Sequence, residues 1–145
     1  MDTKFSTYAC IGDTVERELP GGVYLRARIE HDEYTRPEDC DCYTEEDVQR
    51  WRDDEWSFCG IVVSVHVGTD TIDKHAASLW GIELNFSDDG NSYLDEVADE
   101  LADEVNVLLI LEQHAGTAAA ALAAVRAAVE ESKAARDYAR NYGGE

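Results

Sequence analysis

The chain has 145 residues and a formal net charge of −20, with 32 acidic and 12 basic residues, and its length favours a single domain over residues 1–145. An apolar content of 44% excludes wholesale disorder, while the strong negative charge disfavours direct contact with nucleic acid or anionic membranes and favours a basic protein partner. No apolar run approaches the ~20 residues that span a bilayer, and the first residues lack the pattern of a signal peptide, so we expect a cytoplasmic location.

The first predicted element is a β-hairpin. The turn sequence Leu-Pro-Gly-Gly at residues 19–22 separates residues 14–19 from residues 23–30. In the second segment polar residues alternate with apolar ones, which predicts a half-buried strand. A short edge strand is also expected around Tyr8, Cys10 and Ile11. The core-facing side chains of the hairpin are Val23, Leu25, Ala27 and Ile29, and its basic residues are Arg17, Arg26 and Arg28.

Residues 30–42 are rich in acids and contain Pro37, which predicts an irregular loop. Thr44 is the expected N-cap of a short helix that runs to about Asp53, and Asp47 occupies the position of a capping-box partner. Val48, Trp51 and Arg52 are expected to pack inward.

The four cysteines are expected to be free thiols, because the chain shows no export signal. Cys59 falls on an apolar strand face, which predicts a buried thiol. Cys40 and Cys42 form a C-x-C sequence, whereas zinc ribbons use C-x-x-C. A zinc site built from Cys40, Cys42 and His31 is the alternative to a pair of loop cysteines, and we predict neither a metal nor a cofactor.

Residues 56–86 hold the two clearest strands, and they are close enough in sequence to form one hairpin. In the first strand the almost wholly apolar set at positions 57, 59, 61, 63, 65 and 67 is expected to face the core. Residues 68–75 are expected to form the connection. In the second strand, one face is expected to carry Ser78, Trp80, Ile82, Leu84 and Phe86.

Two helices are predicted after residue 91. Ser92 is the expected N-cap of the first, whose end at residues 107–116 is apolar nearly all round and is expected to be deeply buried or in an interface. Gly116 is its expected stop. The second helix is rich in alanine and is expected to pair with the first as a hairpin or to act in dimerisation, and residues 143–145 are expected to fray. The apolar stripe of the first helix comprises Leu94, Val97, Ala98, Leu101, Val105 and Leu108.

Two rows of acids are expected opposite this apolar stripe. Acids spaced by four residues lie about 6 Å apart along a helix, which approaches the spacing of phosphates along a nucleic-acid strand. Residues 83–112 contain no Lys or Arg, and residues 30–55 form a second acidic segment. These acidic rows allow two interpretations. The protein is a nucleic-acid mimic whose acids bind a basic protein, or the acids are simply the solvent-exposed face of the helix. The predicted partner-binding residues are Asp95, Asp99 and Asp103 in one row and Glu96, Glu100 and Glu104 in the other.

Patterns typical of enzymes are weak. Asp53, Asp54, Glu55 and Glu83 are the acids that a metal-dependent nuclease site would use, but such sites commonly add a lysine and their substrate would be repelled. The histidines show no triad spacing, and His66 is expected at the surface rather than as a base. Three tryptophans, Trp51, Trp56 and Trp80, are expected to anchor the core, with a ligand pocket as the alternative. We therefore expect a protein without catalytic activity.

The segment from Tyr43 to about Val105 resembles a family of small acidic proteins encoded by actinobacterial phages and prophages. The residues that carry the resemblance are the run from Trp51 to Trp56 (WRDDEW), Gly60–Val65 (GIVVSV), Ala77–Glu83 (ASLWGIE) and Tyr93–Leu101 (YLDEVADEL). They cover under half of the chain. The resemblance implies a phage setting and a shared fold, and it implies no reaction.

Together these patterns predict an α+β fold: an antiparallel sheet of three to five strands packed by helices, with a C-terminal helical hairpin. Residues 1–91 are expected to be mainly β with one short helix, and residues 92–142 to form two helices. The expected function is a non-enzymatic phage interaction protein in the host cytoplasm, which binds a basic, nucleic-acid-binding host protein. The alternative is a phage assembly protein that forms oligomers, or a homodimer, through the C-terminal helices.

Overall fold

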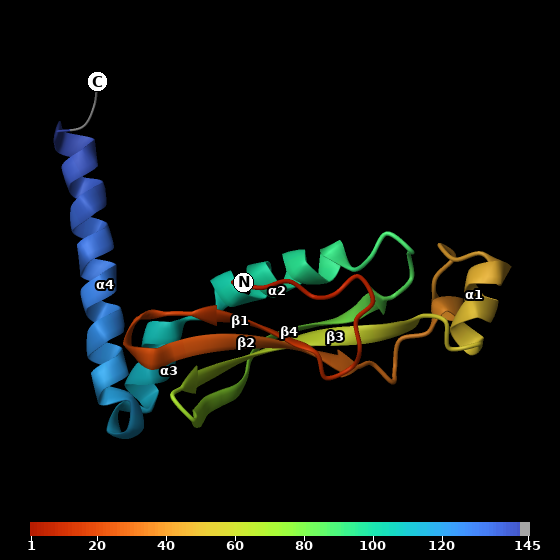
Figure 1. The fold of residues 1–145 in the computed structure, drawn as a ribbon, viewed down its shortest axis with the longest axis horizontal. Helices are drawn as coiled ribbons and strands as arrows, with labels where there is room; N and C mark the ends of the chain where they lie inside the picture. Colours follow the sequence, from red (N-terminus) through yellow and green to blue (C-terminus); the bar gives the residue numbers. More distant parts are fainter. Residues whose placement is uncertain (143–145) are drawn as a thin grey trace.

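The computed structural model of the protein describes residues 1–142, apart from the side chains of residues 117, 138, 139, 141 and 142. The end expected to fray, residues 143–145, lies outside the described residues. The fold is α+β and is built on a four-stranded antiparallel sheet with strand order β1-β2-β3-β4. Helix α2 lies along one face of this sheet, α1 lies beyond one end, and α3 and α4 lie at the other end (Figure 1). The expected fold class is thus confirmed.

The N-terminal hairpin agrees with its prediction. β1 (Thr14–Glu18) and β2 (Val23–His31) are joined by a 3-10 turn at Pro20–Gly22. The four apolar side chains of β2 that alternate inward are each at most 1% exposed. Alternation with period two is therefore a sufficient signal for this strand, because one face is buried and the other is not.

The segment before β1 forms no strand, which contradicts the expectation around Tyr8. Tyr8 and Ile11 are 69% and 46% exposed, whereas Phe5 and Ala9 are buried. The backbone amide of Ala9 donates to the Asn85 side chain at 3.0 Å, and the Asn85 amide returns a bond to the Ala9 carbonyl at 2.8 Å. Side-chain amides therefore take the place of a neighbouring strand.

β3 (Ser57–Val67) and β4 (Asp70–Leu84) form the long central hairpin. Its turn is tight, because Gly68 adopts a φ of +56°, and β4 begins at Asp70. The expected connection over residues 68–75 is therefore wrong from residue 70 onward. Thr71 pairs with His66 in the antiparallel register. Residues 70–75 are polar and were therefore expected to form a loop, but they belong to β4.

A register shift between Cys59 and Ile61 interrupts this hairpin. Gly81 has a φ of +74°, and the indole of Trp80 lies directly on Gly60, where a Cβ atom would come within 2.2 Å of the ring. Trp80 is 43% exposed while Ile82 is 3% exposed. The prediction that these two residues share a face is wrong, because the irregularity shifts the alternation by one position.

α1 (Glu45–Arg52) begins with the predicted capping box: Thr44 accepts from the Asp47 amide, and Asp47 accepts from the Thr44 amide, both at 3.1 Å. Arg52 is exposed, contrary to expectation. Arg50 turns inward instead and donates to the Phe86 carbonyl at 3.1 Å.

The C-terminal region contains three helices rather than two: α2 (Ser92–Glu104), α3 (Val107–Gln113) and α4 (Ala115–Tyr142). The N-cap of α2 is Asn91, not Ser92. Asn106 separates α2 from α3, because its side chain accepts from the Leu109 amide at 3.1 Å and starts a new helix. Gly116 lies within α4 and does not end a helix.

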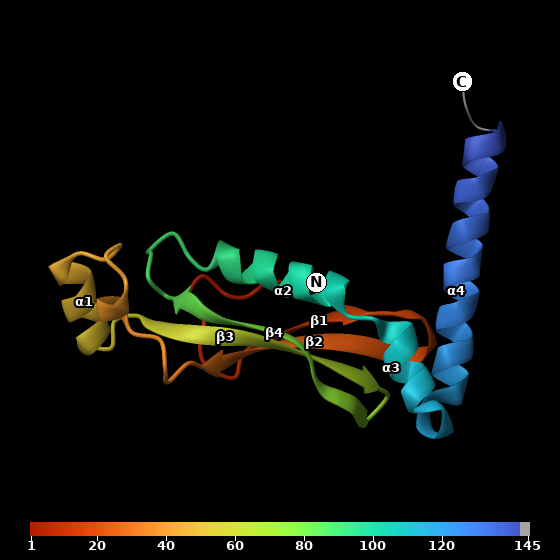
Figure 2. The same cartoon turned by 180° about the vertical axis from the view of Figure 1, so that it is seen from behind.

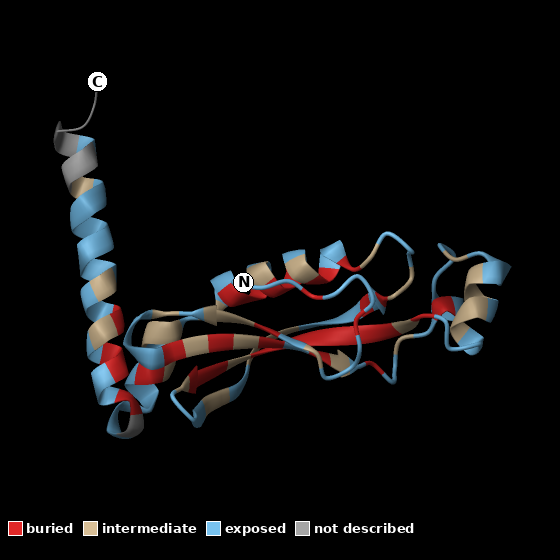
Figure 3. Ribbon diagram, viewed as in Figure 1, coloured by how far each residue is buried: buried red, intermediate tan, exposed pale blue. Residues whose placement is uncertain are grey.

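One cluster of buried residues joins the sheet, α2, Leu111 of α3 and the first turns of α4. α3 packs on α4 as the expected helical hairpin, but only Leu111 of its apolar run is buried. Of the two predicted alternatives for this run, deep burial is therefore wrong and an interface stays a prediction. Beyond Val125 the described side chains of α4 are mostly exposed, and Figures 2 and 3 show this half of α4 extending away from the sheet.

Candidate functional site

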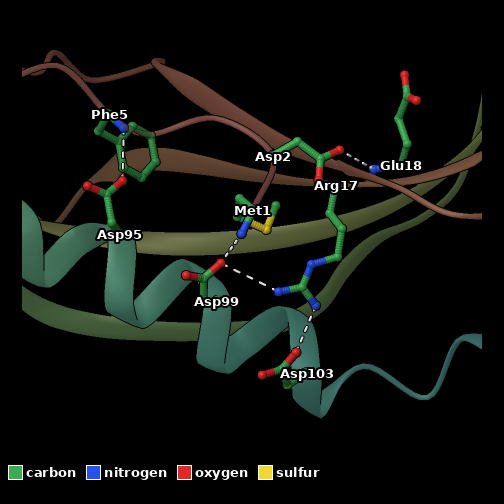
Figure 4. Close-up of polar contacts among 8 residues, drawn as sticks. All are labelled: Met1, Asp2, Phe5, Arg17, Glu18, Asp95, Asp99 and Asp103. Atoms are coloured by element: carbon green, nitrogen blue, oxygen red, sulfur yellow. Dashed lines mark hydrogen bonds and ion pairs between the residues drawn. The ribbon is translucent and has the colours of Figure 1, made fainter.

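The two predicted acidic rows of α2 have different surroundings. The aspartates face the N-terminal segment and β1 (Figure 4). Asp95 accepts from the Phe5 amide at 2.8 Å, and Asp99 pairs with the amine of Met1. Arg17 reaches Asp103 at 2.7 Å and Asp99 at 3.5 Å. The structure therefore places the predicted aspartates in contacts that hold this chain together.

The electrostatics of Asp99 reflect these contacts. Its pKa lies below 3.8, mainly because the Met1 amine hydrogen-bonds to the carboxylate and further because Arg17 is near. Arg17 stands on the β1 face that α2 covers, as does the buried Val15. Sequence reasoning placed both acidic rows opposite the apolar stripe and did not foresee that the N-terminal segment would lie along one of them.

The glutamate row is exposed. Glu96, Glu100 and Glu104 lie on α2 at intervals of four residues, about 6 Å apart. Among the side chains that the structure describes, none forms an ion pair or a side-chain hydrogen bond with any of these three glutamates. Like charges at this spacing weaken a helix slightly, and burial of the stripe on the opposite side offsets that cost. These three side chains can meet a partner without breaking an internal contact.

The second acidic segment, residues 30–55, lies at the α1 end of the sheet and therefore apart from α2 (Figure 1). Several of its acids have structural roles. Asp32 is 7% exposed and accepts bonds from Thr35 and from the amides of Tyr34 and Gly81, all at 3.0 Å or less. Glu38 pairs with Arg52 at 2.9 Å. This segment therefore offers fewer free carboxylates than its composition indicates.

Cys40 and Cys42 are joined in a disulfide, so the expectation of free thiols is wrong for this pair. Their Cα atoms are 5.3 Å apart, within the usual range for such a bond. Cys59 is buried as expected, and burial raises the pKa of its thiol to about 12. In the described part of the chain, no group of three or more His, Cys, Asp or Glu side chains could hold a metal ion.

The three tryptophans differ in burial. Trp51 is only partly buried and α1 contains no buried residue, so its predicted role as a core anchor is wrong. Trp56 is 2% exposed, contacts Tyr43, Phe58 and Phe86 edge-on or tilted, and donates from Nε1 to the Asp47 carbonyl at 2.9 Å. The predicted anchoring role is confirmed for Trp56. Trp80 is no core residue, since one face of its indole rests on Gly60 and the side chain is 43% exposed.

Sequence reasoning missed a polar cluster around His66. This histidine is 6% exposed, which contradicts its expected surface position. Ser64 Oγ lies 2.6 Å from its Nε2, Thr71 Oγ1 lies 3.2 Å from its Nδ1, and its ring stacks on Tyr24 with centroids 4.8 Å apart. Burial lowers the pKa of His66, as does the nearby positive charge of Arg26. The alternation of β3 does place Ser64 and His66 on one face. It does not show that β4 begins at Asp70 and that Thr71 therefore pairs with His66.

No protein-family model, curated protein or solved structure matches the chain. Among the described helices, none combines the length and the apolar character needed to cross a membrane.

Proposed function

We propose that the protein is a non-enzymatic interaction protein of phage origin that acts in the host cytoplasm and binds a basic protein through the acidic face of α2. One observation carries the proposal: the row Glu96, Glu100 and Glu104 is exposed and has no ion-pair partner in the described chain. Complementary charge steers such a partner to the site and speeds its association.

The spacing of the row favours a partner that normally binds nucleic acid. Carboxylates about 6 Å apart along α2 present charges at a spacing close to that of backbone phosphates. A net charge of −20 opposes direct binding of nucleic acid or of an anionic membrane to this protein. The protein would then occupy a host protein's nucleic-acid site and antagonise it.

The test is capture of partners from an actinobacterial lysate at low salt, followed by elution with a salt gradient. A variant with Glu96→Lys, Glu100→Lys and Glu104→Lys should bind about tenfold more weakly or not at all, because like charges now face the partner. We expect the wild-type protein to retain a nucleic-acid-binding protein that elutes as salt rises, and added DNA to displace it.

The matched control replaces Asp88, Asp89 and Glu130 by lysine. These acids are exposed, lie off α2 and give the same net charge as the first variant. The control should retain the partner. Equal loss in both variants would mean that net charge alone governs retention, and equal retention in both would exclude the glutamate row as the site.

A second candidate function is supported by a different observation. Leu109 of α3 and Val129 of α4 are 48% and 43% exposed, and the outer half of α4 extends beyond the sheet. Exposed apolar residues on a helical hairpin can pair with a second copy. The alternative is therefore a phage assembly protein that forms oligomers through α3 and α4.

A further inference from the structure

The face of the sheet opposite α2 carries a cleft of about 420 Å³. Its lining comes from all four strands and is unusual for this molecule, because it gathers basic side chains in an otherwise acidic protein. The residues that matter are Arg26, Arg28, Ser64, His66, Thr71 and Lys74.

The floor of the cleft is polar and fixed. β3 supplies Ser64 and His66, and both ring nitrogens of His66 lie within hydrogen-bonding distance of a hydroxyl, at 2.6 Å and 3.2 Å. The histidine is 6% exposed and its ring stacks on Tyr24 almost in parallel, with an interplanar angle of 8°. These contacts hold the floor in one arrangement, so a ligand would meet a preorganised surface.

The walls carry the positive charge. Arg26 and Arg28 stand on β2 in register with Ser64 and Val62, and Lys74 stands on β4 at the other side of β3. Arg26 is held by Glu16 at 2.9 Å. Arg28 has only a distant contact with Glu30, at 3.9 Å, and Lys74 has no ion pair in the described chain. Two cations therefore have donors free for a ligand.

We propose that this cleft binds the phosphate group of a small molecule. A guanidinium can donate two parallel bonds to a phosphate, and an ammonium adds a point charge. Of the two hydroxyls on His66, the one that accepts from the ring N–H keeps its own proton for a further phosphate oxygen. Glu30 is the one acid among the cleft's described lining residues, so the local charge is positive.

The net charge of the molecule does not prevent this. The acidic helix α2 lies on the other face of the sheet, and at physiological salt charges are screened over about 8 Å. The volume of about 420 Å³ exceeds what a free phosphate fills and falls in the range of small-molecule sites. The site is independent of the acidic face, so failure of either proposal leaves the other intact.

The test follows the ring resonances of His66 by NMR while inorganic phosphate, adenosine monophosphate or adenosine is added. Saturable shifts are expected with the first two probes and none with adenosine. Tighter binding of the nucleotide than of phosphate assigns the cleft to an organic phosphate, and equal binding assigns it to phosphate itself. Shifts of equal size with adenosine, or none with any probe, would overturn the proposal.

Variants identify the residues. Arg28→Ala and Lys74→Ala should each weaken phosphate binding about tenfold, because each removes a charged donor. Both residues are exposed, so neither change should unfold the protein. The matched controls are Arg126→Ala on α4 and Lys4→Ala in the N-terminal segment, and both should bind as the wild type does. Unchanged affinity in the two cleft variants would overturn the assignment.

Discussion

At the scale of single residues, Asp99 joins segments that are far apart in sequence. The Met1 amine and Arg17 meet at its carboxylate, and the pKa of Asp99 lies below 3.8 mainly because of the hydrogen bond from that amine. A carboxyl whose pKa is lower in the folded than in the unfolded chain stabilises the fold above the unfolded value. That contribution is lost as the pH falls through the folded value.

We therefore expect Asp99→Asn to lower the free energy of unfolding at neutral pH by about 1 kcal/mol or less, since the side chain is 50% exposed. The difference from the wild type should shrink as the pH falls below 3.8 and vanish below the folded pKa. Urea denaturation at a series of pH values measures it. Glu100→Gln, which removes an exposed and unpaired carboxylate on the same helix, should not lower the free energy of unfolding at neutral pH, because it also removes like-charge repulsion along α2. A pH-independent loss in Asp99→Asn would contradict the assignment.

The same residues show how far sequence reasoning reaches at this scale. Alternation in β2 identifies the buried apolar positions, because hydrophobic burial acts on each side chain separately. In β3 it finds the core face but not Phe58 and Val62, which are buried on the other face. It does not distinguish the aspartates from the glutamates of α2, since their difference arises from the N-terminal segment packed beside them. Nor does it find His66, whose burial depends on a strand that begins within an expected loop.

At the scale of secondary-structure elements, helices and strands were predicted better than their interruptions. Periodicity detected α2 and its stripe, but the break at Asn106 depends on one side chain capping the next helix. The irregularity in β3 and β4 depends on two glycines. Gly60 leaves room for the Trp80 ring, and Gly81 adopts a positive φ, and neither requirement can be read from composition. A single residue of this kind moves the side chains that follow it to the other face of the sheet. Hydrophobic periodicity does not detect it, because periodicity is judged over several residues.

Gly60 offers a test of this pairing. A Cβ atom at Gly60 would lie 2.2 Å from the Trp80 ring, so Gly60→Ala must displace the indole. We expect a loss of about 1–2 kcal/mol in the free energy of unfolding. In a Trp80→Ala background the same change should cost clearly less, and the difference between the two backgrounds, measured by urea denaturation, is the coupling between the residues. Equal costs in both backgrounds would show that the two residues do not interact.

At the scale of the whole molecule, the long sheet separates an acidic end at α1 from a helical end at α3 and α4. The α1 end carries the second acidic segment, and the other end carries the helical hairpin (Figure 1). Among the described side chains of α4, those that enter the core lie in its first turns: Ala118, Ala121, Leu122 and Val125 are buried, and Gly21 lies against Ala121 and Ala124. The outer half of this helix therefore adds little to the stability of a single copy.

A chain ending at residue 126 tests the role of this outer half. We expect the shortened chain to keep its melting temperature within about 2–4 °C, because the buried contacts of α4 are retained, while far-UV circular dichroism shows the lost helix. If α4 serves assembly, sedimentation should show a defined oligomer for the full chain and a smaller species for the shortened one. Identical sedimentation of both would exclude assembly through residues 127–142, and partner capture by the shortened chain would then be expected to match the full chain.

The contact between the Met1 amine and Asp99 determines which end of the chain should carry a purification tag. A purification tag fused ahead of Met1 would turn that amine into an amide and remove its positive charge. It would also add polypeptide where the N-terminal segment lies along α2, next to the helix that carries the glutamate row. A tag after the outer half of α4 avoids both effects, and a surface that holds the protein by that helix leaves the acidic face and the basic cleft open to solution.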